Sequence, residues 1–349
     1  MMAVVPMPWA LCWQEPLWML RVLDIFTGMP HELLMIYAMD EQRRMAGLNM
    51  NENMLSGQIA RVDINDIEPK AFFRLCRQAG YPVIITGVFD DVPLWSLEHL
   101  TPWLKGNEYW VREFGENRNI AKQSWKAYSE LYEMKFEDYV NSLNSGEASA
   151  NDIYLSQVVL DKDNGLFAGI SSNLNRLCTA CGLTRRMWKN INCHLWLGPK
   201  GHTEPLHSDE GDSTLCQLYG SKKVTLFPSK RHKDLYPFPF FSHMEPWVCQ
   251  VDIDNPDFAK YPRAAKAMAE KLELTLNEKE ILFIPAQWCH QVSIVDKAYA
   301  CSVSIMWDIP FTRNFISGRT LVWYLLRLTP DRLKNWIYDG YYRIAEFLK

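Results

Sequence analysis

No strong excess of charge of either sign is present in this chain of 349 residues, whose formal net charge is −4. Without a run of Lys and Arg, there is no electrostatic reason to expect a nucleic acid or an anionic membrane surface as partner. A Gly-rich phosphate-binding loop and a nucleophile elbow are both missing from the sequence. Their absence disfavours nucleotide-binding and α/β-hydrolase classes.

A disulfide framework is not indicated either. The nine cysteines are odd in number and irregularly spaced, which is typical of a protein from a reducing compartment. The apolar segment 1–26 is interrupted by Pro6, Pro8, Glu15 and Pro16, so it resembles neither a signal peptide nor a membrane span. We therefore expect the cytoplasm, or the nucleus if the host is a eukaryote, and no membrane partner.

Short runs rich in β-branched residues predict a mainly β protein. The clearest is Val83–Thr86, which lies between Pro82 and Gly87. Further strands are expected over 59–64, 153–157, 224–227, 272–276, 280–284, 290–295 and 300–307. Helices are expected over 69–79, 136–143 and 264–271, and a polar loop over 144–151. Many short strands separated by turns favour an antiparallel sandwich or jelly roll.

The sequence His207-Ser208-Asp209 places an imidazole and a carboxylate two residues apart. In a strand, residues i and i+2 point to the same face, so both side chains can reach one metal ion. Two His and one carboxylate form the facial triad of non-haem Fe(II) oxygenases. His290, which follows the segment 284–289, offers the second imidazole.

Several motifs around this pair resemble one known family. The sequence Leu-Gly-Pro-Lys-Gly at 197–201 runs towards Glu-Pro-Leu-His-Ser-Asp at 204–209, and Gln-Leu-Tyr-Gly-Ser-Lys-Lys follows at 217–223. A strand ending at Pro228 and the segment Asn-Pro-Asp at 255–257 come next. From about Arg61 to Trp307 the chain resembles the JmjC (cupin-like) Fe(II)/2-oxoglutarate oxygenases. The resemblance is closest to the small protein-hydroxylase branch, which includes the asparaginyl hydroxylase of hypoxia-inducible factor.

This resemblance implies a fold and a domain organisation. The expected fold is mainly β with flanking helices, built on a double-stranded β-helix (a jelly-roll, or cupin, barrel). We expect a helical N-terminal extension at 1–57, the catalytic barrel at 58–310 and a C-terminal helical pair at 311–349. The helical pair either covers the barrel or, as the resemblance implies, forms a homodimer interface.

The resemblance also implies cofactors and site residues. Fe(II) would be held by His207, Asp209 and His290, with 2-oxoglutarate and O2 as cosubstrates. Lys222, fifteen residues after His207, matches the lysine that neutralises the far carboxylate of 2-oxoglutarate. Tyr154 matches a tyrosine that donates its hydroxyl to the same group.

One position departs from the family pattern. Three residues before His207 the family usually has Thr or Ser, but this chain has Glu204. A carboxylate there repels the cosubstrate unless it is protonated, turned away or paired with a cation. Thr203 or Thr214 are candidate replacements for the missing hydroxyl, and Ser213 stands where relatives often carry Asn near the iron.

The function implied is hydroxylation of a C–H bond, with succinate and CO2 as coproducts. A protein or peptide side chain is the expected substrate. The alternatives are a small-molecule hydroxylase of the same class, or a cupin-like binding module with impaired activity, which Glu204 favours. Cys178-x-x-Cys181 is interpreted as structural, because no convincing second ligand pair accompanies it.

Overall fold

The computed structural model describes residues 58–307, apart from 116–121, 162, 184–192, 210, 240, 241, 243, 245 and 246. The expected N-terminal extension (1–57) and C-terminal helical pair (311–349) lie outside the described residues. The expected boundaries between three domains therefore stay predictions.

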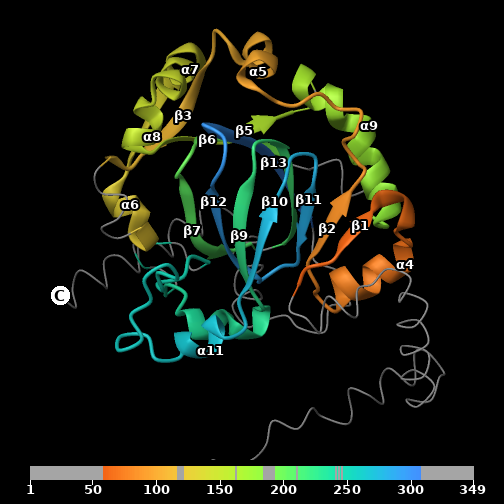
Figure 1. Ribbon diagram of the computed structural model, residues 1–349, viewed down its shortest axis with the longest axis vertical. Helices are drawn as coiled ribbons and strands as arrows, with labels where there is room; N and C mark the ends of the chain where they lie inside the picture. The colour runs from red at the N-terminus through yellow and green to blue at the C-terminus, as the bar shows by residue number, and fades with distance from the viewer. Residues whose placement is uncertain are drawn as a thin grey trace, which may run out of the picture. The chain divides into compact units, whose positions relative to one another are not determined.

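Two sheets make up the centre of the fold (Figure 1). The larger has nine strands in the order β1-β2-β11-β8-β13-β6-β5-β3-β4, and the smaller has four in the order β10-β9-β12-β7. The larger sheet contains β1 (Arg61–Asp63), β2 (Val83–Thr86), β3 (Glu108–Glu113), β4 (Glu130–Lys135), β5 (Ile153–Leu160), β6 (Cys193–Pro199), β8 (Asp212–Tyr219), β11 (Ile281–Ile284) and β13 (Tyr299–Trp307). The smaller contains β7 (Thr203–Ser208), β9 (Lys222–Phe227), β10 (Leu272–Leu276) and β12 (Cys289–Ile294).

In the part that forms the barrel, the chain passes back and forth between the two sheets, except that β9 and β10 follow one another within the smaller sheet. Strands β6, β8, β11 and β13 lie in the larger sheet, whereas β7, β9, β10 and β12 lie in the smaller. All pairings among neighbours in these two groups are antiparallel. This alternation is the jelly-roll arrangement, and the cupin-like fold expected from the sequence is confirmed.

The expected strands agree with the structure to within three residues at their ends. The expected helix over 69–79 is present as α4 (Pro69–Phe72) continued by a π-helix, Phe73–Gln78. The prediction of a polar loop over 144–151 is wrong. Instead α7 (Phe136–Ser145) ends at Gly146, whose φ of 84° stops the helix, and α8 (Glu147–Asn151) follows at once.

Helices lie around the strands in Figure 1. The longest is α9 (Gly165–Ala180), which begins where the Asn164 side chain accepts a hydrogen bond from the Leu166 N–H at 2.9 Å. In its middle, buried Asn173 donates to the Val88 carbonyl at 2.8 Å, and this bond ties the helix to the segment after β2. The other helices are α5 (Leu97–Leu104), α6 (Trp125–Tyr128), α11 (Ala264–Met268) and the 3-10 helices Ile64–Asp66, Lys122–Ser124 and Ser229–Leu235.

Apolar side chains fill part of the space between the two sheets. A buried cluster joins β2, β9 and β11 and includes Ile84, Val224, Leu282 and Trp288. The Trp288 indole N–H donates to the Gly80 carbonyl at 2.8 Å, so its polar atom is satisfied where the ring is buried. Among the described residues, no helix is both long enough and apolar enough to cross a membrane.

The close approach of the Gly211 backbone to β13 can be tested by substitution. A Cβ atom on Gly211 would lie 2.3 Å from the Trp307 carbonyl oxygen, whereas one on Gly169 in α9 would meet no atom within 4 Å. We expect Gly211→Ala to lower the free energy of unfolding by about 1–3 kcal/mol, because backbone of β13 would have to move. Gly169→Ala is the control, and we expect it to raise stability by about 0.5–1 kcal/mol. Urea denaturation measures both, and equal effects of the two changes would contradict the packing described.

Candidate metal centre and cosubstrate pocket

The three expected metal ligands meet at one end of the smaller sheet. His207 lies near the end of β7, Asp209 follows that strand, and His290 on β12 is paired in register with His207. Candidate ligand atoms of the three residues all lie within 4.8 Å of one another. The Nε2 atom of His290 is 3.9 Å from Asp209 Oδ2. The structure therefore brings together residues that are 83 positions apart (290 minus 207).

Hydrogen bonds orient both imidazoles for metal binding. His207 Nδ1 donates to the Pro205 carbonyl at 2.7 Å, and His290 Nδ1 donates to the Trp288 carbonyl at 3.1 Å. Because a carbonyl oxygen only accepts, each Nδ1 carries the proton and each Nε2 keeps a free lone pair. Burial, with a contribution from nearby His207, lowers the pKa of His290 to about 4, so that ring is neutral at neutral pH.

Two polar contacts hold the carboxylate side of the centre. The Ser213 hydroxyl donates a hydrogen bond to Asp209 Oδ2 at 2.5 Å. Ser213, which the resemblance placed near the metal, thus contacts one of the candidate ligands. The backbone N–H of Gln287 donates to the Asp209 carbonyl at 3.2 Å. Such contacts around ligands fix their orientation.

A buried ion pair supports the turn that precedes His290. Asp212 is fully buried and accepts from the Ala286 backbone N–H at 2.9 Å. Its other carboxylate oxygen accepts from Arg77 Nε at 3.2 Å, and Arg77 is also buried. Asp212 thereby links β8, the π-helix and the residues leading into β12.

Strand register places Lys222 on the same face of the sheet as His290. On β12, His290, Val292 and Ile294 point to one side, and their partners on β9 are Leu226, Val224 and Lys222. Lys223 therefore points to the opposite face, where it pairs with Glu273 at 2.8 Å.

Lys222 is a buried ammonium group. It is 3% exposed, and its Nζ donates to the Ser302 hydroxyl at 2.6 Å. Among the described residues, no carboxylate lies within 4.0 Å of this nitrogen. Burial lowers the pKa of Lys222 to about 8, because a charged amine is poorly stabilised away from water.

A bulge in β7 turns Glu204 to the face of His207. His290 pairs with His207, but Val292 pairs with Glu204, so β7 has one residue more than β12 between these pairs. Glu204 and His207 therefore lie on the same face of β7 although they are three residues apart, and Thr203 points to the other face. The Thr203 hydroxyl bonds to that of Ser293 at 2.9 Å, and the register does not bring Thr203 together with Lys222.

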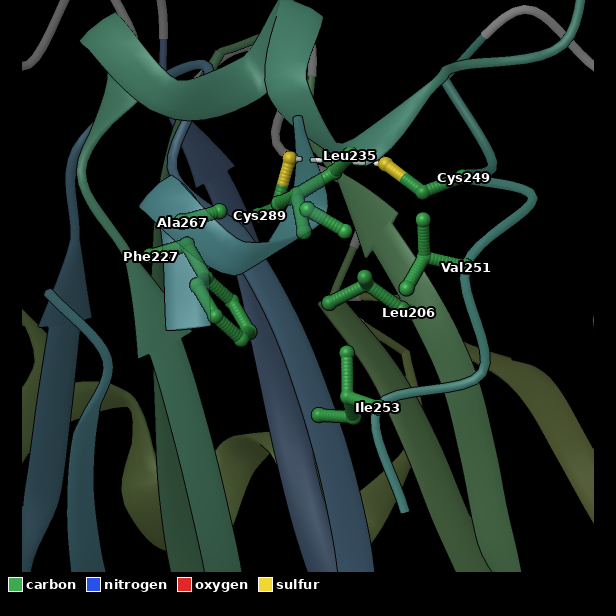
Figure 2. Packing of buried hydrophobic residues seen from close by; sticks show 9 residues of the cluster. Leu206, Phe227, Leu235, Cys249, Val251, Ile253, Ala267 and Cys289 are labelled. Carbon is green, nitrogen blue, oxygen red and sulfur yellow. Dashed lines mark hydrogen bonds between the residues drawn. The ribbon is translucent and has the colours of Figure 1, made fainter. Parts of the chain in front are cut away.

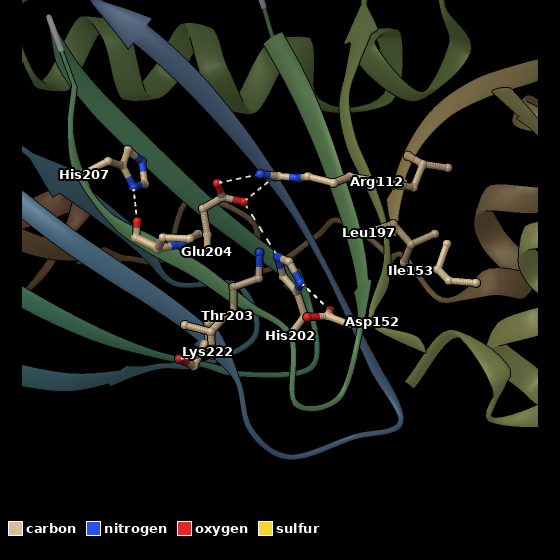
Figure 3. Close-up of polar contacts among 12 residues, drawn as sticks. Arg112, Asp152, Ile153, Leu197, His202, Thr203, Glu204, His207 and Lys222 are labelled. Atoms are coloured by element: carbon tan, nitrogen blue, oxygen red, sulfur yellow. Dashed lines mark hydrogen bonds and ion pairs between the residues drawn. The ribbon is translucent and has the colours of Figure 1, made fainter. Parts of the chain in front are cut away.

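Glu204 is paired with a cation, which is one of the three outcomes considered from the sequence. Arg112 on β3 contacts both of its carboxylate oxygens, at 2.8 and 3.5 Å (Figure 3). The guanidinium also lies 4.4 Å from the centre of the Trp125 ring. Burial alone would raise the pKa of Glu204, but Arg112 and His202 more than offset it and keep the carboxyl ionised.

Tyr154 lies beside this ion pair. It is paired in register with Arg112, and its ring stacks on His202 at 3.6 Å between centres. His202 Nδ1 is 2.7 Å from Asp152 Oδ1. Burial by itself would lower the pKa of His202, but the two neighbouring carboxylates, Asp152 and Glu204, raise it overall. Tyr154 therefore lies within a network of charges around Glu204, and its contact with 2-oxoglutarate stays a prediction.

Some functional residues were missed by sequence reasoning. Arg112 lies on β3, whose sequence Glu-Tyr-Trp-Val-Arg-Glu matches no motif, and it meets Glu204 only through the fold. Asp212 and Arg77 are 135 residues apart and likewise meet only through the fold. Thr214, one of the candidate replacement hydroxyls, accepts a hydrogen bond from Trp307 Nε1 at 3.2 Å.

Removal of Arg112 tests the pairing of Glu204. We expect Arg112→Met to lower the free energy of unfolding by about 3 kcal/mol or more, because it leaves a largely buried carboxylate without its partner. Adding Glu204→Thr to that variant removes the unpaired charge and recovers most of the loss. Denaturant unfolding of the single and double variants measures this coupling. Two additive, uncoupled effects would contradict the ion pair.

Comparisons with known proteins agree with this architecture. Lysine-specific demethylase 8 of Xenopus tropicalis is 26% identical over 240 residues, which cover 65% of this chain and 48% of that protein. Lysine-specific demethylase JMJ30 of Arabidopsis thaliana is 29% identical over 249 residues, covering 68% and 52%. Human tRNA wybutosine-synthesizing protein 5 is 37% identical over 101 residues, 29% of each chain.

The chain spans about half the length of the demethylases that it matches. These relatives support the resemblance to JmjC proteins, one of them being named JmjC domain-containing protein D, from Dictyostelium discoideum. They do not support the finer expectation of the asparaginyl hydroxylase branch, which stays a prediction. Residues 69–313, most of the chain, match the cupin-like domain family. The chain is therefore a member of the cupin-like domain family.

Proposed function

We propose that this protein is an Fe(II)- and 2-oxoglutarate-dependent oxygenase that hydroxylates a C–H bond on a protein or peptide side chain. One observation supports this above the others. The His207, Asp209 and His290 cluster shares a barrel face with Lys222, a buried cation that has no carboxylate partner among the described residues.

The donor atoms fit ferrous iron. Two imidazoles with free Nε2 atoms and one carboxylate on a single side match the facial triad, which leaves positions open for other ligands. Bound Fe(II), with 2-oxoglutarate and O2, would supply the oxidising chemistry and give succinate and CO2 as coproducts. The protein holds the ligands, orients them and excludes water from the barrel.

The charges fit a dianionic cosubstrate. Arg112 balances Glu204, so this ion pair leaves the positive charge of Lys222 uncompensated. A buried cation without an anion is costly, and a carboxylate beside Lys222 and the Ser302 hydroxyl would satisfy it. The Tyr154 hydroxyl is a further candidate donor, and Thr203 is the weakest, since it lies on the other face of β7.

Two considerations bear on the substrate. Two of the relatives described above are named as lysine-specific demethylases. A lysine-specific enzyme acts on an amino-acid side chain, which favours a protein or peptide as the substrate of this chain as well. Oxidation of an N-methyl C–H bond is itself a C–H hydroxylation, so the proposal includes this case. The impaired binding module is disfavoured, because Arg112 neutralises the one residue, Glu204, that spoke for it.

Turnover tests the proposal. We expect the full chain, given Fe(II), 2-oxoglutarate and O2, to release succinate, and the release to rise when a library of protein-derived peptides is added. Mass spectrometry should then find peptides that gained one oxygen atom. His207→Ala should abolish both signals, because it removes a ligand. Succinate release by the wild type at the same rate as by His207→Ala would contradict an oxygenase.

The pKa of Lys222 predicts a pH dependence of cosubstrate binding. Only the ammonium form attracts a carboxylate, so as pH rises through the depressed pKa of about 8 the affinity should fall. We expect roughly a tenfold loss of 2-oxoglutarate affinity between about pH 7 and pH 9. Anaerobic calorimetry measures this. The charge of the arginine in Lys222→Arg does not titrate in this range, so the affinity of that variant should not change with pH. If its affinity still fell as in the wild type, the pH dependence would belong to another group.

A further inference from the structure

A second cluster of metal-ligating side chains lies on the opposite face of the smaller sheet. His232, Cys249 and Cys289 each offer one ligand atom, and these atoms lie within 4.8 Å of one another. Cys289 begins β12, directly before His290. Because neighbouring residues in a strand point to opposite faces, Cys289 points away from the barrel interior where His290 lies.

Three separate segments supply these side chains. His232 belongs to the 3-10 helix Ser229–Leu235, and Cys249 lies in the segment paired to Pro237. The Cys249 backbone N–H donates to the Leu206 carbonyl at 2.9 Å, while Cys289 pairs with Phe227 on β9. Each ligand is thus fixed by backbone contacts of its own, which is what a preformed site requires.

The two thiols point towards each other in Figure 2. Their sulfur atoms are 3.6 Å apart, and both cysteines are free. A disulfide would need about 2.05 Å, whereas two thiolates on one tetrahedral zinc ion lie about 3.8 Å apart, given Zn–S bonds of about 2.3 Å. The observed sulfur–sulfur distance is therefore close to that of two thiolates bound to one metal ion.

The histidine has an unsatisfied polar atom. His232 Nε2 is buried and makes no hydrogen bond of ordinary geometry among the described residues, and its polar neighbour is the Cys249 thiol, itself a weak hydrogen-bonding group. Buried polar atoms in folded proteins nearly always have a hydrogen-bond partner. Cys249 and Cys289 are fully buried within an apolar cluster that includes Leu206, Phe227 and Leu235. A metal ion would give the imidazole the partner that this apolar surrounding does not.

We propose that His232, Cys249 and Cys289 form a zinc site that is separate from the candidate iron centre. Two thiolates and one neutral imidazole bring a charge of −2, which Zn²⁺ balances, so the site is neutral in its apolar surroundings. A monovalent copper ion would leave the site with a net charge of −1, and Mg²⁺ and Ca²⁺ prefer oxygen ligands. Both alternatives are therefore less suitable than Zn²⁺. Three protein ligands leave a fourth position for water.

The site would join the segment after β9 to the strand that carries His290. Zinc bound there fixes the start of β12 from outside the barrel, while iron would be bound from inside. This inference is independent of the proposed function, because it uses none of the residues of the triad or of the cosubstrate pocket.

Cobalt titration of the full chain tests the site. The His207→Ala variant is used so that the triad does not compete, and free thiols are counted under reducing conditions beforehand. We expect one equivalent of Co²⁺ to give the intense charge-transfer absorption of a cobalt thiolate, and Zn²⁺ to displace it. His207→Ala with Cys249→Ser should lose the absorption, whereas His207→Ala with Cys216→Ser, a buried cysteine outside the cluster, should keep it. No thiolate absorption in the reduced protein would overturn the proposal.

A second variant covers the case in which Cys249→Ser does not fold. His232→Gln leaves both sulfur atoms in place, and in the His207→Ala background it should weaken zinc binding by about 100-fold or more, since changes outside the ligand shell alone cost about 10–100-fold. Competition with a chromophoric chelator measures the affinity. Zinc should also raise the melting temperature of His207→Ala and not that of the His232→Gln double variant. Equal zinc affinity in both proteins would show that His232 is not a ligand and refute the site.

Discussion

The antiparallel pairing of β7 with β12 is the constraint on which the candidate site depends. It sets His207 directly across from His290, and the bulge in β7 turns Glu204 to the same face. The neighbouring pairing of β12 with β9 then places Lys222 on that face. A shift of one residue in either register would move these side chains to the other side of the sheet. The candidate metal ligands His207 and His290 and the candidate cosubstrate anchor Lys222 are therefore positioned by the backbone hydrogen bonds of one sheet.

Charge compensation explains why a glutamate is tolerated in the pocket. Arg112 contacts both oxygens of Glu204 and stacks near Trp125, so the pair is neutral and held in one orientation. Lys222 has no such carboxylate partner among the described residues. The barrel thus keeps one buried positive charge at Lys222, which is the charge that the proposed anionic cosubstrate requires.

Spacing in the sequence indicated two of the three candidate metal ligands and several strands, and the role of the candidate ligands stays a prediction. Strand alternation singled out His207 and Asp209, and a run of β-branched residues predicted β2, whereas Lys222 was indicated by the resemblance to the JmjC family. The partner of Glu204 was not predictable, because Arg112 is 92 residues away and has no motif of its own. The error over 144–151 has a local cause: its polar residues favour a loop, but Gly146 separates two short helices there.

The central claim is that this barrel holds iron and 2-oxoglutarate together, and anaerobic titration tests it most directly. Fe(II) followed by 2-oxoglutarate should produce the weak visible charge-transfer band of the iron chelate in the wild type. The band should be lost in His207→Ala and much weakened in Lys222→Ala, but kept in Lys223→Ala, whose side chain points to the other face. A wild type that binds iron without developing the band, or a band that survives in His207→Ala, would contradict the account.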